Sequence, residues 1–184
     1  MKATGIVRRI DDLGRVVIPK EIRRTMRIRE GDPLEIYTDR EGEVIFKKYS
    51  PIGELQTFAG EYADTLQKTS GMSIFICDRD EIIAVSGASK REYLDKKISE
   101  ELDEIIDSRA LYINKMNRED KKITDSDSEH YISCAMPIIA EGDVIGCVVS
   151  GTTKGADPSS KISPEVEMKL IQTAGMFLGK QMES

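Results

Sequence analysis

The sequence predicts two domains: a small β-rich domain with one short helix, followed by a larger α+β domain. The chain has 184 residues, which suits one large or two small domains. Strand-like alternation prevails at the start, whereas helical and strand-like periods mix later. Formal charge also changes sign, because residues 1–50 hold 12 Lys and Arg against 9 Asp and Glu, and residues 51–184 hold 15 against 24. We therefore expect domains at 1–52 and 53–184.

Composition bounds the class of protein. Hydrophobic residues make up 39% of the chain and charged residues 33%, which is enough apolar material for packed cores and too mixed in charge for a disordered tail. Cys77, Cys134 and Cys147 lie in apolar runs, as reduced core cysteines of a cytosolic protein do. No apolar stretch approaches the ~18 residues of a membrane span, and the start has no signal-peptide core. We expect a cytoplasmic protein without a membrane partner.

The first domain is predicted to hold two pairs of short strands around one short helix. Alternating side chains indicate the strands, Asp11-Asp12-Leu13-Gly14 forms a turn in the first pair, and Pro19 suits the start of the helix. In chain order the predicted elements are strands 4–10 and 15–18, helix 20–26, and strands 34–38 and 44–48. A unit with so few large side chains buries too little apolar surface to be stable alone, so we expect it to dimerise.

Basic side chains are concentrated at the start of the chain. Residues 1–29 hold nine Lys and Arg against three Asp and Glu, although the whole chain has a net charge of −6. A phosphate backbone docks on such a surface, and a two-fold dimer presents each cation twice, as a pair of DNA half-sites requires. We therefore expect double-stranded DNA as a partner.

Three segments of the first domain are distinctive: Thr4 to Arg8, Asp11 to Pro19 with the run Leu-Gly-Arg-Val-Val-Ile-Pro, and Glu21 to Arg24. Together they closely resemble the DNA-binding domain of the AbrB-type regulators of spore-forming bacteria. The resemblance implies a swapped-hairpin dimer, in which strands of two chains interleave into one barrel-like fold. It also implies that the arginines matching the family's DNA contacts face the duplex, namely Arg8, Arg15, Arg23 and Arg24.

Arginine suits this role on physical grounds. Its guanidinium holds phosphate oxygens or guanine edges in bidentate geometry, whereas lysine acts as a point charge. Weaker candidates, for phosphate contacts only, are Lys2, Arg9 and Lys20. The alternative is that Arg8, Arg23 and Arg24 are solvated surface charges. Their partners would then be the nearby carboxylates Asp11, Asp12 and Glu21.

The second domain is predicted as an α+β sandwich, with an antiparallel sheet flanked by helices. Pro51 to Gly53 form a linker, and Ser163 and Pro164 mark the start of the last helix. Between them the predicted elements are a helix over 55–66, strands 72–77 and 82–86, a helix carrying Leu94 to Ile106, a short segment 110–113, a polar stretch 117–130, and strands 131–139 and 144–152. This order is similar to GAF domains, the small-molecule sensor modules of bacterial regulators.

The resemblance to GAF domains implies a ligand between one sheet face and its covering helices and loops, with a lid at 117–130 or 87–91. The sequence identifies no ligand-binding residue. His130 is the only histidine and the cysteines lack zinc-knuckle spacing, so we expect no metal, and no motif indicates another cofactor. We also expect no enzyme, since phosphate-loop, HExxH and nucleophile-elbow motifs are absent and no cysteine has a flanking His, Lys or Arg.

The first and last helices of this domain carry apolar stripes, which either pair between subunits or cover the sheet of their own chain. Gly175 and Gly179 either admit another helix closely or only weaken a fraying end. If the two domains dimerise with different partners, a homotetramer results, and this is the assembly we expect.

Together these patterns predict a transcription regulator, activating or repressing, whose DNA affinity is tuned by an unidentified small-molecule effector. The whole chain also resembles a sporulation regulator, which implies control of genes expressed in the forespore. The alternative is an antitoxin-like protein-interaction module, because swapped-hairpin antitoxins bind toxins through a disordered tail. Residues 54–182 instead have a core-forming pattern.

Overall fold

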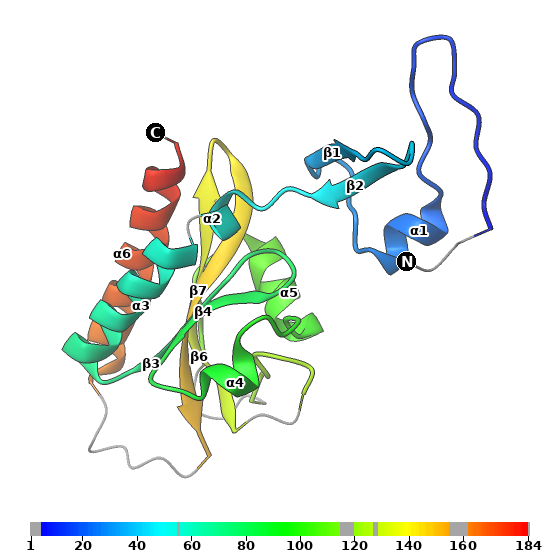
Figure 1. Cartoon of the computed structure of the whole chain (residues 1–184). Coiled ribbons are helices and arrows are strands. Elements are labelled where there is room, and N and C mark those ends of the chain that lie inside the picture. The colour runs from blue at the N-terminus through cyan, green and yellow to red at the C-terminus, as the bar shows by residue number, and fades with distance from the viewer. Residues whose placement is uncertain (1–4, 55, 115–119, 127–128, 155–161, 184) are drawn as a thin grey trace. The chain divides into compact units, whose positions relative to one another are not determined.

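The computed structural model describes residues 5–54, 56–114, 120–126, 129–154 and 162–183. Contacts between residues divide the chain into two compact units, Met1–Tyr49 and Ser50–Ser184 (Figure 1). No described helix is both long and apolar enough to cross a membrane.

The first unit contains one short helix and one strand pair. Helix α1 (Lys20–Thr25) precedes strands β1 (Leu34–Thr38) and β2 (Val44–Lys48), which pair antiparallel. At the turn between the strands, a carboxylate oxygen of Asp39 accepts hydrogen bonds from the backbone N–H groups of Glu41 at 3.0 Å and Glu43 at 2.8 Å. The predicted helix and second strand pair are therefore confirmed.

The first predicted strand pair is not formed in the described part of the single chain. Residues 5–19 form a long loop of two arms, the second of which leads into α1 (Figure 1). Only the tip is tied, by hydrogen bonds from the backbone N–H of Asp11 to the carbonyl of Arg15 and from that of Gly14 to the carbonyl of Asp11, both 3.0 Å. A strand requires a partner ladder along its length, and among the described residues of one chain the arms have none.

The second unit is built on a five-stranded antiparallel sheet in the order β4-β3-β7-β6-β5. Its strands are β3 (Ser73–Cys77), β4 (Ile82–Ser86), β5 (Tyr112–Ile113), β6 (His130–Ala140) and β7 (Asp143–Thr153). Strands β6 and β7 form a hairpin in which Glu141 and Gly142 both have positive φ, as the tight turns that match strand twist require. The predicted antiparallel sheet is confirmed.

Helices cover both faces of this sheet (Figure 1). On one side lie α2 (Pro51–Glu54), α3 (Gln56–Ser70) and α6 (Pro164–Met182), and on the other α4 (Lys90–Tyr93) and α5 (Glu100–Ser108). Each face has its own cluster of buried side chains, centred on residues such as Ile74 and Leu178 on one side and Phe75 and Leu102 on the other. The α+β sandwich expected from the sequence is thus observed.

Two expectations about the second unit are wrong in detail. The linker expected at residues 51–53 belongs to α2, because the side chain of Ile52 is buried in the core. The helix expected over 94–106 begins only at Glu100, the first residue of α5, because residues 94–99 are not helical. Asp95 takes a left-handed backbone conformation, and Ser99 caps α5 by accepting from the N–H of Leu102.

The two glycines of α6 face strand β6. A Cβ at Gly179 would overlap the carbonyl oxygen of Ile139, and one at Gly175 would lie 2.6 Å from Cγ of Met136. Within the described chain these glycines therefore allow α6 to approach a strand closely, and not another helix.

Candidate nucleic-acid interface

The predicted DNA-binding residues lie on the two-armed loop and on α1. Arg8, Arg9 and Arg15 are exposed on the arms, and Lys20 and Arg24 are exposed on α1. Arg23, also on α1, is half-buried, and its Nε is shielded from solvent with no hydrogen-bond partner among the described residues. Lys2 lies outside the described residues.

Arg15 is held in place by Asp11. One carboxylate oxygen of Asp11 accepts from the Nε of Arg15 at 2.8 Å, and the other accepts from the backbone N–H groups of Arg15 at 2.8 Å and Leu13 at 3.0 Å. These hydrogen bonds, first the backbone bond from Arg15 and then its side-chain bond, lower the pKa of Asp11. No hydrogen bond or ion pair within the described residues engages the terminal guanidinium nitrogens of Arg15, and the side chain is 69% exposed, so these nitrogens are available to a ligand.

The other described residues among the predicted DNA contacts have no carboxylate partner within the described chain. Within the described residues, no ion pair is formed by Arg8, Arg9, Lys20, Arg23 or Arg24. Asp11 pairs with Arg15, while Asp12 and Glu21 form no ion pair in the same part of the chain. The alternative in which nearby carboxylates neutralise these arginines is therefore not supported by the geometry.

The loop that carries these cations is also apolar and exposed. Val7 is 90% exposed, and Leu13 and Val17 are each 69% exposed. Soluble single chains rarely present such a run of large apolar side chains without a partner surface. The same loop thus combines unpaired positive charge with uncovered apolar area.

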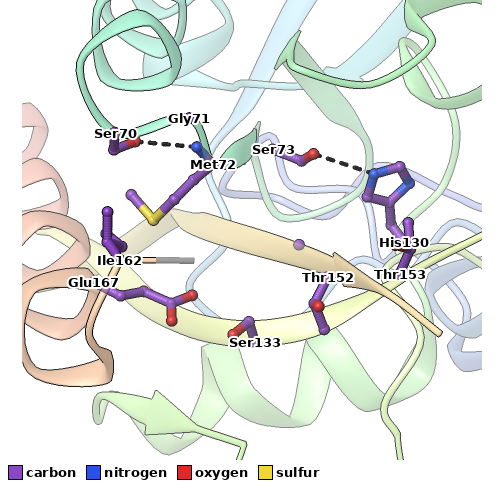
Figure 2. A pocket seen from close by; sticks show the side chains of 11 residues that line it. Ser70, Gly71, Met72, Ser73, His130, Ser133, Thr152, Thr153, Ile162 and Glu167 are labelled. Carbon is purple, nitrogen blue, oxygen red and sulfur yellow. Dashed lines mark hydrogen bonds between the residues drawn. The ribbon is translucent and has the colours of Figure 1, made fainter. Parts of the chain in front are cut away.

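The second unit contains a cavity of about 180 Å³ (Figure 2). It lies where α3 leads into β3, where β6 begins, where β7 ends, and beside the start of α6. The lining residues are Ser70, Gly71, Met72, Ser73, His130, Ser133, Gly151, Thr152, Thr153, Ile162 and Glu167. The stretch 117–130, expected as a lid, lies partly outside the described residues, and no cluster of three or more metal-ligating side chains occurs within them.

The sequence analysis missed both Asp11 as a partner of Arg15 and the residues of this cavity. The four-residue spacing of Asp11 and Arg15 across a turn was an available signal. The cavity gave none, because its residues come from four separate segments that only the fold brings together.

Comparison with known proteins adds the family. A family model described as the C-terminal part of stage V sporulation protein T, a transcription factor, matches residues 54–183. Another, described as antidote-toxin recognition MazE, a bacterial antitoxin, matches residues 7–53. Stage V sporulation protein T of Bacillus subtilis (strain 168) is 55% identical over 183 residues, covering 100% of this chain and 99% of that protein.

Two further relatives match one unit each. The transition state regulatory protein AbrB of Bacillus subtilis (strain 168) is 55% identical over 71 residues, which are 39% of this chain and 72% of AbrB. The crystal structure of the nlh2 GAF domain of A. aeolicus shares 18% identity with a TM-score of 0.50, covering 68% of this chain and 82% of that one. At that identity the likeness shows the GAF-type fold alone.

A basic unit that matches AbrB, followed by an α+β unit with the GAF-type fold, defines an AbrB-type regulator with an appended GAF-type domain. The chain belongs to the stage V sporulation protein T family. It is accordingly a sporulation transcription regulator, and both resemblances drawn from the sequence are confirmed.

Proposed function

We propose that this protein regulates sporulation genes by binding duplex DNA through the cations of its first unit. The observation that carries the proposal is the group of cations on the loop and α1 without a carboxylate partner among the described residues. DNA phosphates supply that missing negative charge, and counterion release then favours binding. Bound at a promoter, the protein activates or represses transcription. It acts in the cytoplasm, and if its targets are the forespore genes implied by the resemblance, it acts in the cytoplasm of the forespore.

The cations divide into two roles. We assign base or bidentate phosphate contacts to Arg8, Arg15, Arg23 and Arg24, because the guanidinium group matches both partners. We assign phosphate contacts alone to Lys2, Arg9 and Lys20. Among the described members of this group, Arg15 is the one whose side chain is anchored by a hydrogen bond, since Asp11 accepts from its Nε and leaves its terminal nitrogens available.

Dimerisation through the first unit completes this surface. The exposed apolar side chains of the two arms, among them Val7 and Val17, require a cover, and the arms also require a hydrogen-bonding ladder. A second copy interleaving its own hairpin satisfies both needs at once. The resulting two-fold axis presents each arginine to two DNA half-sites.

The second unit supplies another contact between subunits, which makes the assembly a homotetramer. Phe58 and Tyr62 of α3 and Phe177 of α6 form one aromatic patch, with the rings of Tyr62 and Phe177 stacked 5.3 Å apart. The side chain of Phe177 remains 40% exposed. A patch of this kind on two adjacent helices suits pairing with the same helices of a second copy.

We also propose that a small effector bound to the GAF-like unit modulates DNA binding. Such an effector changes DNA affinity only through its differential affinity for the two states, which typically amounts to about 1–3 kcal/mol. The test is a titration of DNA affinity with a ligand shown to occupy the second unit. A bound ligand that leaves DNA affinity unchanged would remove this part of the proposal.

An antitoxin-like interaction module is the second candidate, favoured by the match of residues 7–53 to the antitoxin model. Such modules hold their partner through a disordered tail. Residues 50–184 instead form a compact unit with two buried clusters, which favours the DNA-binding regulator over this alternative.

The test compares DNA binding by the wild-type chain and four alanine variants, of Arg8, Arg15, Arg23 and Arg24, across a salt series. The probe is a duplex selected by the wild-type chain from a random-sequence pool, and circular dichroism checks folding. Each lost phosphate contact lowers the log–log salt slope by roughly one, whereas a lost base contact costs about 1–3 kcal/mol and relaxes specificity.

Arg40→Ala is the matched control, because Arg40 is an exposed arginine of the same unit in the turn between β1 and β2. It removes the same charge away from the loop and α1, so we expect a small effect only. If the four folded variants bind DNA as Arg40→Ala does, the basic surface is not the DNA-binding site and the interaction-module candidate takes precedence.

A further inference from the structure

The sheet face covered by α4 and α5 is filled by the protein's own side chains. Phe75, Tyr93 and Ile123 are less than 2% exposed there, together with Ile98, Leu102, Ile106 and Ile132. A ligand on this face would have to displace close-packed core side chains, at a cost of several kcal/mol. The cavity beside the start of α6 needs no such displacement.

Among the described residues, the lining of the cavity carries one negative charge. Glu167 is the sole Asp, Glu, Lys or Arg among the lining residues, and within the described chain it forms no ion pair. Figure 2 shows its carboxylate turned into the space between Ile162 and Ser133. A partly buried carboxylate without a counter-ion favours a ligand that brings a positive charge.

This carboxylate is held in a fixed position. Its Oε1 accepts a hydrogen bond from the Oγ of Ser150 at 2.6 Å, and Ser150 is fully buried. The same Oγ accepts from the backbone N–H of Cys134 at 3.1 Å, which anchors it to strand β6. No hydrogen bond within the described residues engages Oε2, so the second oxygen is available to a ligand.

The opposite wall of the cavity is neutral and polar. The Oγ of Ser73 donates to the carbonyl of Gly87 at 2.9 Å, so at the 3.2 Å contact with His130 the Nε2–H of the imidazole donates to Ser73. The Nδ1 of His130 then accepts from the hydroxyl of Tyr93 at 3.0 Å. Burial lowers the pKa of His130, so the imidazole is uncharged at neutral pH and adds no positive charge to the cavity.

We propose that this cavity binds a small primary amine, with its ammonium on Oε2 of Glu167 and its polar end among the serine and threonine hydroxyls. The ligand is small, because the volume of the cavity is only about 180 Å³. An anionic ligand is disfavoured, since Glu167 would repel it. The proposal deepens the effector part of the proposed function by giving the effector a site and a chemical class.

The test uses three probes on one two-carbon frame: ethanolamine, ethylene glycol and glycolate, which are cationic, neutral and anionic. The readout is the NMR resonance of the Met72 methyl group in the full-length chain labelled at methionine methyls, since Met72 lines the cavity and the other methionines serve as references. We expect ethanolamine to shift this resonance in a saturable way at millimolar concentration, and the other two probes to leave it in place.

Two variants make the test specific. Glu167→Gln keeps an acceptor for Ser150 and removes the charge, so we expect ethanolamine to bind at least tenfold more weakly. Glu165→Gln is the matched control, because Glu165 lies in the same first turn of α6, outside the cavity, and pairs with Lys169. We expect Glu165→Gln to bind ethanolamine with the same affinity as the wild type.

Equal shifts with all three probes, saturable binding of glycolate, or unchanged affinity in Glu167→Gln would each overturn the proposal. The measurement contains no DNA. A negative result with the amine would therefore leave the DNA-binding proposal intact. Likewise, arginine variants that bind DNA as Arg40→Ala does would leave the amine site intact.

Discussion

The Asp11 carboxylate binds Arg15 twice, at the backbone N–H and at the side-chain Nε, both at 2.8 Å. It therefore fixes the loop tip and the guanidinium together. Asp11 is an acidic residue on a surface that we propose binds a polyanion, and its proposed role is to orient Arg15, not to contact DNA.

Asp11→Asn tests this orienting role. The variant loses the charge-assisted hydrogen bonds, so we expect DNA affinity to fall roughly two- to fivefold relative to Asp12→Asn, within the range of exposed ion pairs. Asp12→Asn is the control, because Asp12 makes no ion pair among the described residues and reports the gain from removing a negative charge. Fluorescence anisotropy on one duplex measures both, and equal affinities would contradict the orienting role.

The aromatic patch makes a prediction about assembly. Phe177→Glu places a charge in the proposed contact between second units, so we expect the tetramer to dissociate to dimers held by the first units. Light scattering after size exclusion at micromolar concentration gives the mass. Gln172→Glu, an exposed position on the same helix, should remain tetrameric. A wild-type chain that is only dimeric at this concentration would refute the tetramer.

Alanine substitutions at Gly179 and at Gly60 should change the free energy of unfolding in opposite directions. Gly179→Ala sets a Cβ against the carbonyl oxygen of Ile139, so we expect a loss of about 1–3 kcal/mol in the free energy of unfolding. Gly60→Ala, on α3 with no atom within 4 Å of the new Cβ, should instead gain about 0.5–1 kcal/mol. Urea unfolding measures both. A neutral Gly179→Ala would mean that α6 does not approach β6 this closely.

The partial burial of His130 predicts that the free energy of unfolding depends on pH. Burial lowers the pKa of His130 below 6.5, against a smaller opposing effect of Glu129 and Glu92. The unfolded chain therefore takes up the proton first as pH falls. The stability contributed by the neutral imidazole is complete above about pH 6.5 and is lost as pH falls through the folded pKa.

The chain has one histidine, so the assignment is direct. Between pH 7.5 and 5.5 we expect the urea midpoint of the wild type to fall further than that of His130→Gln. NMR titration of the imidazole should give a pKa below 6.5. Parallel midpoints, or an imidazole pKa at or above 6.5, would disprove the prediction.

The three cysteines are predicted to be unreactive in the folded protein. All three are buried, and desolvation raises the pKa of Cys134 to about 12 and raises those of Cys77 and Cys147 as well. Iodoacetamide at pH 8 should label none of them without denaturant and all three in urea, as read by mass spectrometry. Rapid native labelling would contradict the buried, protonated state.

Much of the fold was predictable because it depends on local periodicity. The pattern of α3, the hairpin of β6 and β7, and the cap formed by Ser163 on α6 are all encoded within short windows of sequence. The cations were predictable for a similar reason, since charge and a distinctive motif are properties of the sequence itself. The late start of α5 at Glu100 was not, because residues 94–99 leave the helix with the left-handed backbone of Asp95.

By itself, the sequence determined the two-unit order, most of the strand and helix periods, and the presence of a basic N-terminal segment that needs a partner. Only the tertiary structure decided that Asp11 binds Arg15 and that Gly179 lies against Ile139. It also decided that Glu167 lines a cavity while accepting a hydrogen bond from a buried serine. The reason is physical. Periodicity and charge are carried by neighbouring residues, whereas a contact between distant segments exists only after the chain has packed.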